Sequence, residues 1–192
     1  MKIGVLALQG AFREHIKMLQ QLGIETVEVR LPDQLSGIDG LIIPGGESTT
    51  IGKLAIDYGL IDPLRAFVRI KPTWGTCAGM IFLAKNIGID EQPILGAMDI
   101  EVNRNAFGRQ IDSFETNIKI DGLSGEPFHA VFIRAPIVKQ VDPSVTILSQ
   151  LEDGRIVAVQ QNHLLATSFH PELTDDLRLH TYFCDIVREK TS

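Results

Sequence analysis

The sequence predicts an α/β protein with a mostly parallel sheet, and three observations support this prediction. Near-continuous apolar runs, as expected of buried parallel strands, alternate with segments whose apolar residues recur at helical spacing. The connections between these segments are short and rich in glycine and proline. From Met98 onward the pattern changes to short strand-like runs separated by turn residues. This second half predicts antiparallel strands, either added to the edge of the sheet or forming a small second sheet.

Strands and helices alternate in the first half. The expected strands are Lys2–Leu8, Glu25–Arg30, Gly40–Ile43 and the short approach Thr73–Trp74. The expected helices lie between Gly10 and Gly23, over Glu47–Tyr58 and over Pro63–Ile70. This order of elements is typical of parallel sheets with helical connections.

Short strands and a closing helix follow in the second half. The strand-like runs are Met98–Arg104, Phe114–Ile120, Ala130–Ile133, Val145–Leu148, Arg155–Gln160 and His163–Ser168. The last helix is expected from Thr174, as its N-cap, to about Val187. No repeat or linker divides the chain, so we expect residues 1–192 to form one domain.

Composition and charge exclude several classes of protein. Of the 192 residues, 44% are hydrophobic and 22% charged, which is typical of a globular protein. A net charge of −6 without any Lys/Arg run argues against nucleic-acid binding. No apolar stretch approaches the roughly 20 residues that a membrane span requires. The two cysteines, Cys77 and Cys184, fit neither a disulfide nor a zinc pattern, so we expect a soluble protein of the reducing cytoplasm without a metal.

A cysteine lies in a sharp strand-turn-helix motif. The segment Gly75–Gly79 reads GTCAG, the cysteine form of the nucleophile elbow. Glycines are needed there because Cβ atoms would collide with the turn or with the following helix. The start of that helix favours a thiolate on Cys77 and an oxyanion beside it. The pentapeptide alone fits a small buried core cysteine equally well.

A histidine and a glutamate complete a possible triad. His170 precedes Pro171, which favours an extended backbone, and in an extended chain Glu172 points to the same side as His170. A carboxylate in that place would fix the tautomer of the imidazole and stabilise its charged form. Cys77, His170 and Glu172 are therefore predicted as nucleophile, base and orienting acid. The other four histidines are expected on the surface or on helix faces, and Cys184 in the core.

A glycine-rich turn follows the strand that ends at Ile43. The segment Pro44–Ser48 reads PGGES and lies at the edge of the sheet where parallel strands place ligands. It lacks the lysine of a phosphate-binding P-loop. We interpret it as half of an oxyanion hole, with the N–H of Gly46 paired with that of Ala78. An ordinary connection with glycines for geometry is the alternative.

These motifs resemble those of the class I, triad-type glutamine amidotransferases, and among them the glutaminase subunits of pyridoxal 5′-phosphate synthases. The segments that carry the resemblance run from the first strand to the last helix: Gly4–Gly10, Arg13–His15, Pro44–Thr50, Gly75–Gly79, Arg104–Gln110, Asp112–Glu115, Phe132–Pro136 and Ser168–Thr174. Trp74 stands where phenylalanine is expected, which is a packing difference beside the elbow.

The resemblance implies a three-layer, flavodoxin-like sheet and hydrolysis of L-glutamine to glutamate and ammonia. The ammonia would pass to a separate synthase subunit in a large hetero-oligomer that makes pyridoxal 5′-phosphate, and the glutaminase itself would need no cofactor. A γ-glutamyl thioester would form on Cys77. The glutamine site would comprise Gly46, Glu47, Ser48, Arg104, Ile133 and Arg134. Without the resemblance, both arginines would read as surface ion-pair residues.

The same resemblance implies a docking surface for the synthase. Its residues would be Gln9, Gly10, Arg13, Glu14 and His15. One hypothesis is that the Gly45–Gly46 peptide is misoriented in the free subunit and that docking, sensed by Gln9, completes the oxyanion hole.

Three other functions fit the triad or its remains. The chain could be the glutaminase of another biosynthetic pathway, a stand-alone γ-glutamyl hydrolase, or a catalytically silent regulatory subunit. The presence of Cys77, His170 and Glu172 together argues against the last.

Overall fold

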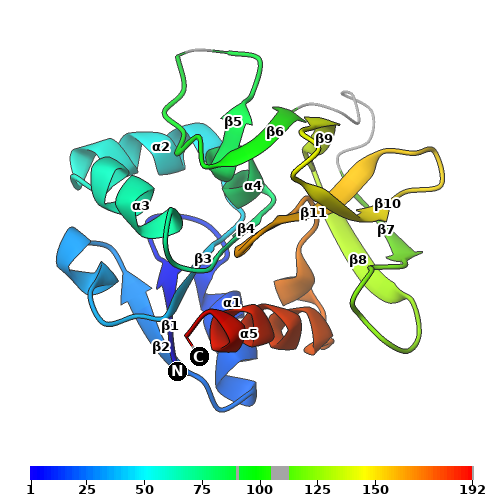
Figure 1. The fold of residues 1–192 in the computed structure, drawn as a ribbon, viewed down its shortest axis with the longest axis horizontal. Coiled ribbons are helices and arrows are strands. Elements are labelled where there is room, and N and C mark those ends of the chain that lie inside the picture. The colour runs from blue at the N-terminus through cyan, green and yellow to red at the C-terminus, as the bar shows by residue number, and fades with distance from the viewer. Residues whose placement is uncertain (90, 105–112, 192) are drawn as a thin grey trace.

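The computed structural model describes residues 1–89, 91–104 and 113–191 and contains a large mixed sheet flanked by helices (Figure 1). The first strands are β1 (Lys2–Leu6), β2 (Glu25–Val29), β3 (Gly40–Ile43) and β4 (Thr73–Thr76). They pair in parallel in the order β2-β1-β3-β4, and β12 (Leu164–Thr167) joins β4 in parallel. The carboxyl ends of these strands therefore meet at one edge, where the site lies.

Helices cover both faces of the parallel strands, which gives the expected three layers. Figure 1 shows α1 (Phe12–Gln21) and α5 (Arg178–Thr191) together on one side of the sheet. The other side carries α2 (Ser48–Asp57), α3 (Ile61–Val68) and α4 (Ala78–Leu83). Alternate residues of β3 serve the two cores, because Leu41 and Ile43 pack toward α2–α4 while Ile42 packs toward α1 and α5.

The second half extends the sheet with antiparallel strands and adds a second sheet, so both predicted alternatives occur. Beyond β12 the order continues with β11 (Ile156–Gln161), β9 (Ile137–Val141), β6 (Met98–Asn103) and β5 (Ala84–Asn86), and β10 (Thr146–Gln150) pairs with β11. The separate sheet consists of β7 (Ser113–Ile118) and β8 (Phe128–Ile133). The predicted fold class is confirmed, although β5 and β9 were not anticipated.

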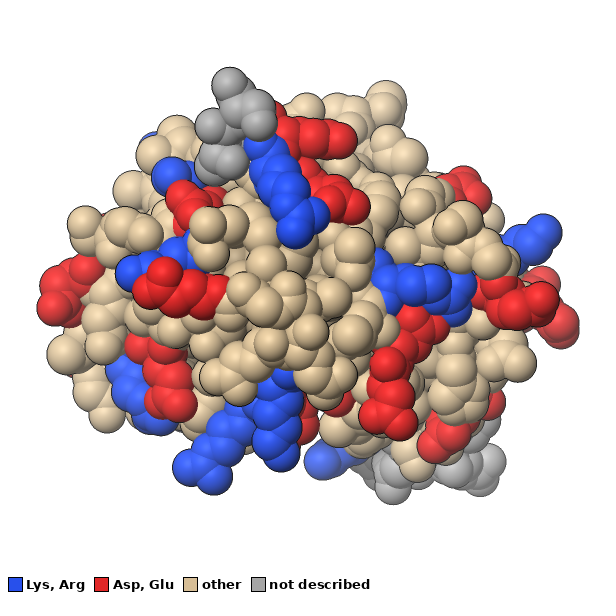
Figure 2. All heavy atoms as spheres, turned by 90° about the horizontal axis from the view of Figure 1, so that it is seen from below, with Lys and Arg blue, Asp and Glu red and all other residues tan. Residues whose placement is uncertain are grey.

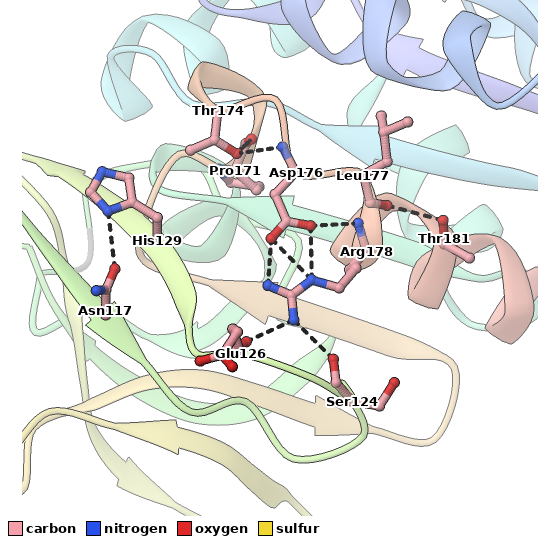
Figure 3. A network of polar contacts seen from close by, with 10 residues as sticks. All are labelled: Asn117, Ser124, Glu126, His129, Pro171, Thr174, Asp176, Leu177, Arg178 and Thr181. Atoms are coloured by element: carbon pink, nitrogen blue, oxygen red, sulfur yellow. Dashed lines mark hydrogen bonds and ion pairs between the residues drawn. The ribbon is translucent and has the colours of Figure 1, made fainter.

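The closing helix begins later than predicted, so Thr174 is not its N-cap. The preceding residues form a 3₁₀ turn, η2 (Pro171–Leu173), and the Thr174 hydroxyl donates to the carbonyl of Pro171 at 2.9 Å. Asp176 instead accepts from the backbone N–H of Arg178, and its carboxylate also holds the Arg178 guanidinium (Figure 3). The helix then runs to Thr191 rather than to Val187.

On the face drawn in Figure 2, charged side chains of both signs are present. Basic and acidic side chains are interspersed there among uncharged ones. Within the described ranges, no helix is both long enough and apolar enough to cross a membrane.

Another 3₁₀ turn, η1 (Pro32–Leu35), lies earlier in the chain and connects β2 to β3. The predicted motif residues Asn105–Gln110 and Asp112 lie outside the described residues.

Candidate active site

The elbow places Cys77 at the junction of β4 and α4 with a strained backbone. Its φ is 49° and its ψ is −107°, a conformation that non-glycine residues rarely adopt. A Cβ on Gly75 would lie 2.4 Å from the carbonyl oxygen of Gly79, and one on Gly79 would lie 2.0 Å from that of Ile43. Both glycines are therefore required by close backbone contacts, as the motif predicts.

Contacts with two neighbouring strands, β12 and β8, hold the elbow in place. The N–H of Cys77 donates to the carbonyl of Thr167 at the end of β12, over 2.8 Å. Its Sγ lies 3.9 Å from the carbonyl oxygen of Ile133 at the end of β8. Ala78 is the first residue of α4, where backbone N–H groups have no partner within the helix. The sulfur thus faces the space in front of the helix start.

The imidazole of His170 contacts both Cys77 and Glu172. His170 Nδ1 lies 2.7 Å from Glu172 Oε1, and the Glu172 side chain has no exposed surface. The N–H of His170 donates to the carbonyl of Val131 in β8 over 2.8 Å, which ties η2 to the second sheet. The structure therefore brings together the three residues that were predicted as a triad.

Contacts with Cys77 and Glu172 decide the charge of His170. Burial alone would lower the pKa of this imidazole, which is 8% exposed. The hydrogen bonds with Cys77 and Glu172, together with their charges, outweigh burial and raise the pKa of His170 to about 10. An imidazolium beside a thiol is the arrangement that favours a thiolate nucleophile.

The glycine turn after β3 packs against the catalytic pair. A Cβ on Gly45 would lie 2.4 Å from His170 Cε1 and 3.2 Å from Cys77 Cβ, so only glycine fits. The Gly45 carbonyl accepts from the N–H of Ala11 at 3.0 Å. Gln9 Oε1 accepts from the N–H of Glu47 at 2.7 Å. The segment before α1 therefore sets the orientation of this turn.

A cavity of about 460 Å³ opens in front of Cys77. Its lining includes every residue that was predicted to bind glutamine: Gly46, Glu47, Ser48, Arg104, Ile133 and Arg134. Cys77, Ala78 and His170 also line it, whereas Glu172 lies behind His170. The volume lies within the range of small-molecule sites.

Charged groups at the cavity are held by neighbours. Although burial would raise the pKa of Glu47, hydrogen bonds from Thr50 and Thr49 at the start of α2 lower it to about 2. Arg104 Nη2 lies 3.9 Å from Glu47 Oε1 and 3.3 Å from Thr49 Oγ1. Arg134 is exposed at the cavity with φ of 41°. A carboxylate and two guanidinium groups thus face a space suited to a zwitterion.

The chain is similar to one known protein family over most of its length. Residues 5–189 match the model of the SNO glutamine amidotransferase family. The chain belongs to this family. The match begins within β1 and ends within α5, so it includes every residue that lines the cavity.

Individual members of the SNO family are closely similar. The pyridoxal 5′-phosphate synthase subunit PdxT of Carboxydothermus hydrogenoformans is 57% identical over 97% of this chain and 98% of its own length. The same subunit of Moorella thermoacetica is 56% identical over 97% and 100%. The crystal structure of a glutamine amidotransferase has a TM-score of 0.91 at 52% identity and covers 97% of this chain and 98% of that one.

A more distant structure shares the fold alone. A chain of PurLQS from Thermotoga maritima has a TM-score of 0.71 at 16% identity, covering 96% of this chain and 97% of that one.

The residues predicted to contact a synthase lie in different environments: at the cavity, on the surface and in the core. Gln9 and Gly10 line the cavity, Arg13 is exposed and Glu14 is half-buried. His15, in contrast, has no exposed surface and points into the core. Its prediction as a surface contact was wrong, because α1 buries the face that carries His15, Met18 and Leu19.

His180 lies on a helix face, one of the two places expected for it, and it is fully buried and bonded to His15. The burial of both histidines could have been predicted from their helical spacing to apolar residues. His15 follows Phe12 by three residues and precedes Leu19 by four, and His180 precedes Phe183 and Cys184 by three and four. Both histidines therefore lie on apolar helix faces. Cys184 is buried as predicted.

Further cavity residues escaped prediction. Ala11, Ile81 and Leu173 line the cavity beside the predicted set. Ile81 lies one turn into α4 and Leu173 follows the HPE motif, so their spacing from Cys77 and His170 could have identified them. In the described part of the chain, no three His, Cys, Asp or Glu side chains group to hold a metal ion.

Proposed function

We propose that this chain is the glutaminase subunit of a pyridoxal 5′-phosphate synthase, a single domain that hydrolyses L-glutamine and supplies ammonia to a separate synthase subunit. The observation that carries the proposal is the contact of His170 with both Cys77 and Glu172 at the wall of the cavity. Near full-length likeness to PdxT subunits specifies the pathway. The cytoplasm, with its reduced thiols, is the compartment that suits a free cysteine nucleophile.

The first half of the reaction makes a thioester. The Cys77 thiolate attacks the side-chain amide carbon of glutamine, and the N–H groups of Gly46 and Ala78 receive the negative charge on its oxygen. His170 then donates its proton to the amide nitrogen, the C–N bond breaks, and ammonia leaves. Glu172 keeps the imidazole in place and balances its charge before the transfer.

The second half releases glutamate. The now neutral His170 takes a proton from water as the water oxygen attacks the thioester carbon. The C–S bond breaks, glutamate leaves, and Cys77 returns to the thiolate beside the imidazolium. Arg104 or Arg134 would bind the α-carboxylate of glutamine, and Glu47 would face the α-ammonium group.

Docking of the synthase would control the oxyanion hole. The Gly45 carbonyl is bonded to Ala11 and the Glu47 N–H to Gln9, so the Gly45–Gly46 peptide is tied to the segment that also carries the predicted docking residues. Movement of the segment from Gln9 to Ala11 on docking would release both bonds and free this peptide to turn its N–H toward the substrate. Such coupling would prevent the loss of glutamine without a consumer.

Ammonia release from glutamine, with and without an added pyridoxal phosphate synthase subunit, tests the proposal. We expect low activity alone, strong stimulation by the synthase, and none in Cys77→Ala. Equal rates with and without the synthase would refute the coupling and indicate a stand-alone hydrolase. No ammonia in either case would refute the glutaminase assignment.

A further inference from the structure

A second polar cluster lies behind the triad, on the side of Glu172 that faces away from the cavity. It consists of His15 from α1, His180 from α5 and Thr76 from β4, all with no exposed surface. Trp74 packs its ring against both histidines, at centroid distances of 5.6 and 5.0 Å. Three separate elements thus converge on a buried carboxylate, which is costly for a core that could be apolar.

The cluster forms a chain of contacts that ends on Glu172. His180 Nε2 lies 2.9 Å from His15 Nδ1. His15 Nε2 lies 3.1 Å from Thr76 Oγ1 and 3.4 Å from Glu172 Oε2. Glu172 Oε2 is buried and has no partner at full hydrogen-bond geometry among the described residues. The polar contact that the structure gives this oxygen is the one with His15 Nε2 at 3.4 Å. The other oxygen, Oε1, is engaged by His170.

Electrostatics select one tautomer for each histidine. With a lone pair on His15 Nε2, that lone pair would face the Glu172 carboxylate, which is unfavourable. With a proton there, His15 offers an N–H to Glu172 and Thr76, and its Nδ1 must accept from His180 Nε2–H. His180 Nδ1 is then an unprotonated nitrogen, consistent with its lack of a partner among the described residues. The N–H groups of His180 and His15 therefore both point along the chain of contacts toward Glu172.

Both histidines of the cluster, His15 and His180, are uncharged and so do not compete with His170 for an ion pair with Glu172. Burial lowers the pKa of His180 to about 3. Burial, followed by the nearby His180 and His170, lowers the pKa of His15 well below its ordinary value. Both are therefore neutral when His170 is charged, and the Glu172 carboxylate pairs with the charged catalytic imidazole.

We propose that His15, held by His180, is a positioning residue for the glutaminase reaction: its Nε2–H fixes the second oxygen of Glu172 so that the first stays bonded to His170. This role rests on the proposed function. A carboxylate held at one oxygen only can rotate, whereas contacts at both oxygens fix its plane and hence the orientation of the His170 ring.

The placement of His180 depends on how α5 begins. The Arg178 guanidinium is held by the Asp176 carboxylate and donates to the carbonyls of Ser124 and Glu126 (Figure 3). The Thr181 hydroxyl donates to the carbonyl of Leu177 in the same turn. These bonds fix the first turn of α5 to the loop between β7 and β8. His180 is therefore presented to His15 from a rigid base.

Two variants of His15 separate positioning from packing. In His15→Leu the donor is lost, whereas in His15→Gln the amide nitrogen can occupy the place of Nε2 and keep an N–H toward Glu172. A matched control is His163→Leu, which removes a partly buried imidazole whose Nε2 lies 2.9 Å from the Val68 carbonyl oxygen, at the start of β12 remote from the site. Each is assayed with a saturating synthase subunit, and each is also examined by proton NMR for the His170 Nδ1–H in its bond to Glu172.

We expect kcat to fall about tenfold in His15→Leu with KM unchanged, the size typical of losing a group that orients a catalytic contact. The downfield His170 proton should broaden or vanish in His15→Leu. His15→Gln should retain most of kcat and the proton signal, and His163→Leu should retain both. Wild-type kcat in His15→Leu, or equal losses in the Leu and Gln variants, would overturn the proposal. An inactive wild-type protein would instead refute the proposed function.

A measurement on the unaltered protein covers the case in which His15→Leu does not fold. Nitrogen NMR of ¹⁵N-histidine-labelled protein distinguishes the two neutral tautomers directly. We expect His15 and His180 to carry their protons on Nε2. A proton on His15 Nδ1 would overturn the proposal, because Nε2 could then offer nothing to Glu172.

Discussion

Histidines on the two sides of Glu172 are almost equally buried, but one is charged and the other neutral. His170 on the cavity side is 8% exposed and has its pKa raised to about 10, because bonds with Cys77 and Glu172 overcome burial. His180 on the core side is 0% exposed and has its pKa lowered to about 3 by burial. Burial keeps His180 neutral, whereas at His170 the bonds and charges of Cys77 and Glu172 outweigh burial. Burial alone therefore does not decide the charge of an imidazole here.

The largest effect should come from removing the nucleophile. Cys77→Ala should lower ammonia release by at least about 10³-fold, since no other group in the cavity can form the thioester. Cys184→Ala is the matched control, because Cys184 lies in the core with its pKa raised to about 11 by burial and should not react. Activity retained in Cys77→Ala would contradict the assignment of the site.

Neutralising the carboxylate between the two sides should have the next largest effect. Glu172→Gln keeps an acceptor for His170 but removes the charge, and kcat should fall about 10²- to 10⁴-fold. The pKa of His170 should also fall, because the Glu172 bond and charge raise it. Glu115→Gln alters a similar but exposed pair, with Glu115 Oε2 2.8 Å from His129 Nε2, and should leave kcat unchanged. Equal kcat in both variants would disprove the role of Glu172.

Removing a charged side chain from the cavity wall should change KM for glutamine rather than kcat. Arg104→Met should raise KM for glutamine by about tenfold and leave kcat within a factor of two, because a charge-assisted bond to the α-carboxylate is lost. Arg65→Met on α3 removes an arginine that pairs with the exposed Asp62 and should not alter KM. Initial rates over a range of glutamine concentrations distinguish the two effects. A change confined to kcat would place Arg104 outside the substrate site.

The buried His180 on the core side of Glu172 should lower the free energy of unfolding at mildly acidic pH. Since the folded pKa of His180 lies below the ordinary 6.5, the unfolded chain binds a proton that the folded chain does not as the pH falls below 6.5. Through His180, lowering the pH from 6.5 to 5 should therefore cost roughly 2 kcal/mol of unfolding free energy. His170 does not mask this, because its raised pKa makes its contribution complete below 6.5 and lost only as the pH rises toward about 10.

Urea denaturation at pH 6.5 and pH 5 measures that cost. The difference between the two pH values should be smaller in His180→Leu than in the unaltered protein, whatever the absolute stability of the variant. His129→Gln, an exposed histidine, should leave the difference unchanged. An equal pH difference in His180→Leu and the unaltered protein would show that His180 is charged in the folded state or not buried as described.

Local patterns were sufficient for the parallel half of the fold and for the residues at its edge. The GTCAG and PGGES turns occur where buried runs end, and parallel strands bring their carboxyl ends together, so Cys77 and Gly46 were predicted to be near each other. Glu172 lies beside His170 as predicted, but in the 3₁₀ turn η2 rather than in the extended chain that the spacing argument assumed. The resemblance, rather than the pattern, directed attention to Arg104, Ile133 and Arg134.

Long-range packing determines what the patterns missed. Ile133 and Arg134 reach the cavity because the second sheet is tied to η2 by the bond from His170 to Val131, a contact that no local signal reports. Thr174 satisfies the rule for an N-cap, but its hydroxyl is used by η2. His15 was assigned to the docking surface by the resemblance, yet helical periodicity places it on the apolar face of α1.

The most direct test of the contrast across Glu172 is a pH titration of ¹⁵N-histidine-labelled protein by NMR. Between pH 5 and pH 8, His170 should show both ring nitrogens protonated, while His15 and His180 should remain neutral. The signal of His170 should change only as the pH rises toward 10. A neutral His170 at pH 7, or a charged His15 or His180 there, would contradict the division of charge on which both the mechanism and the positioning role depend.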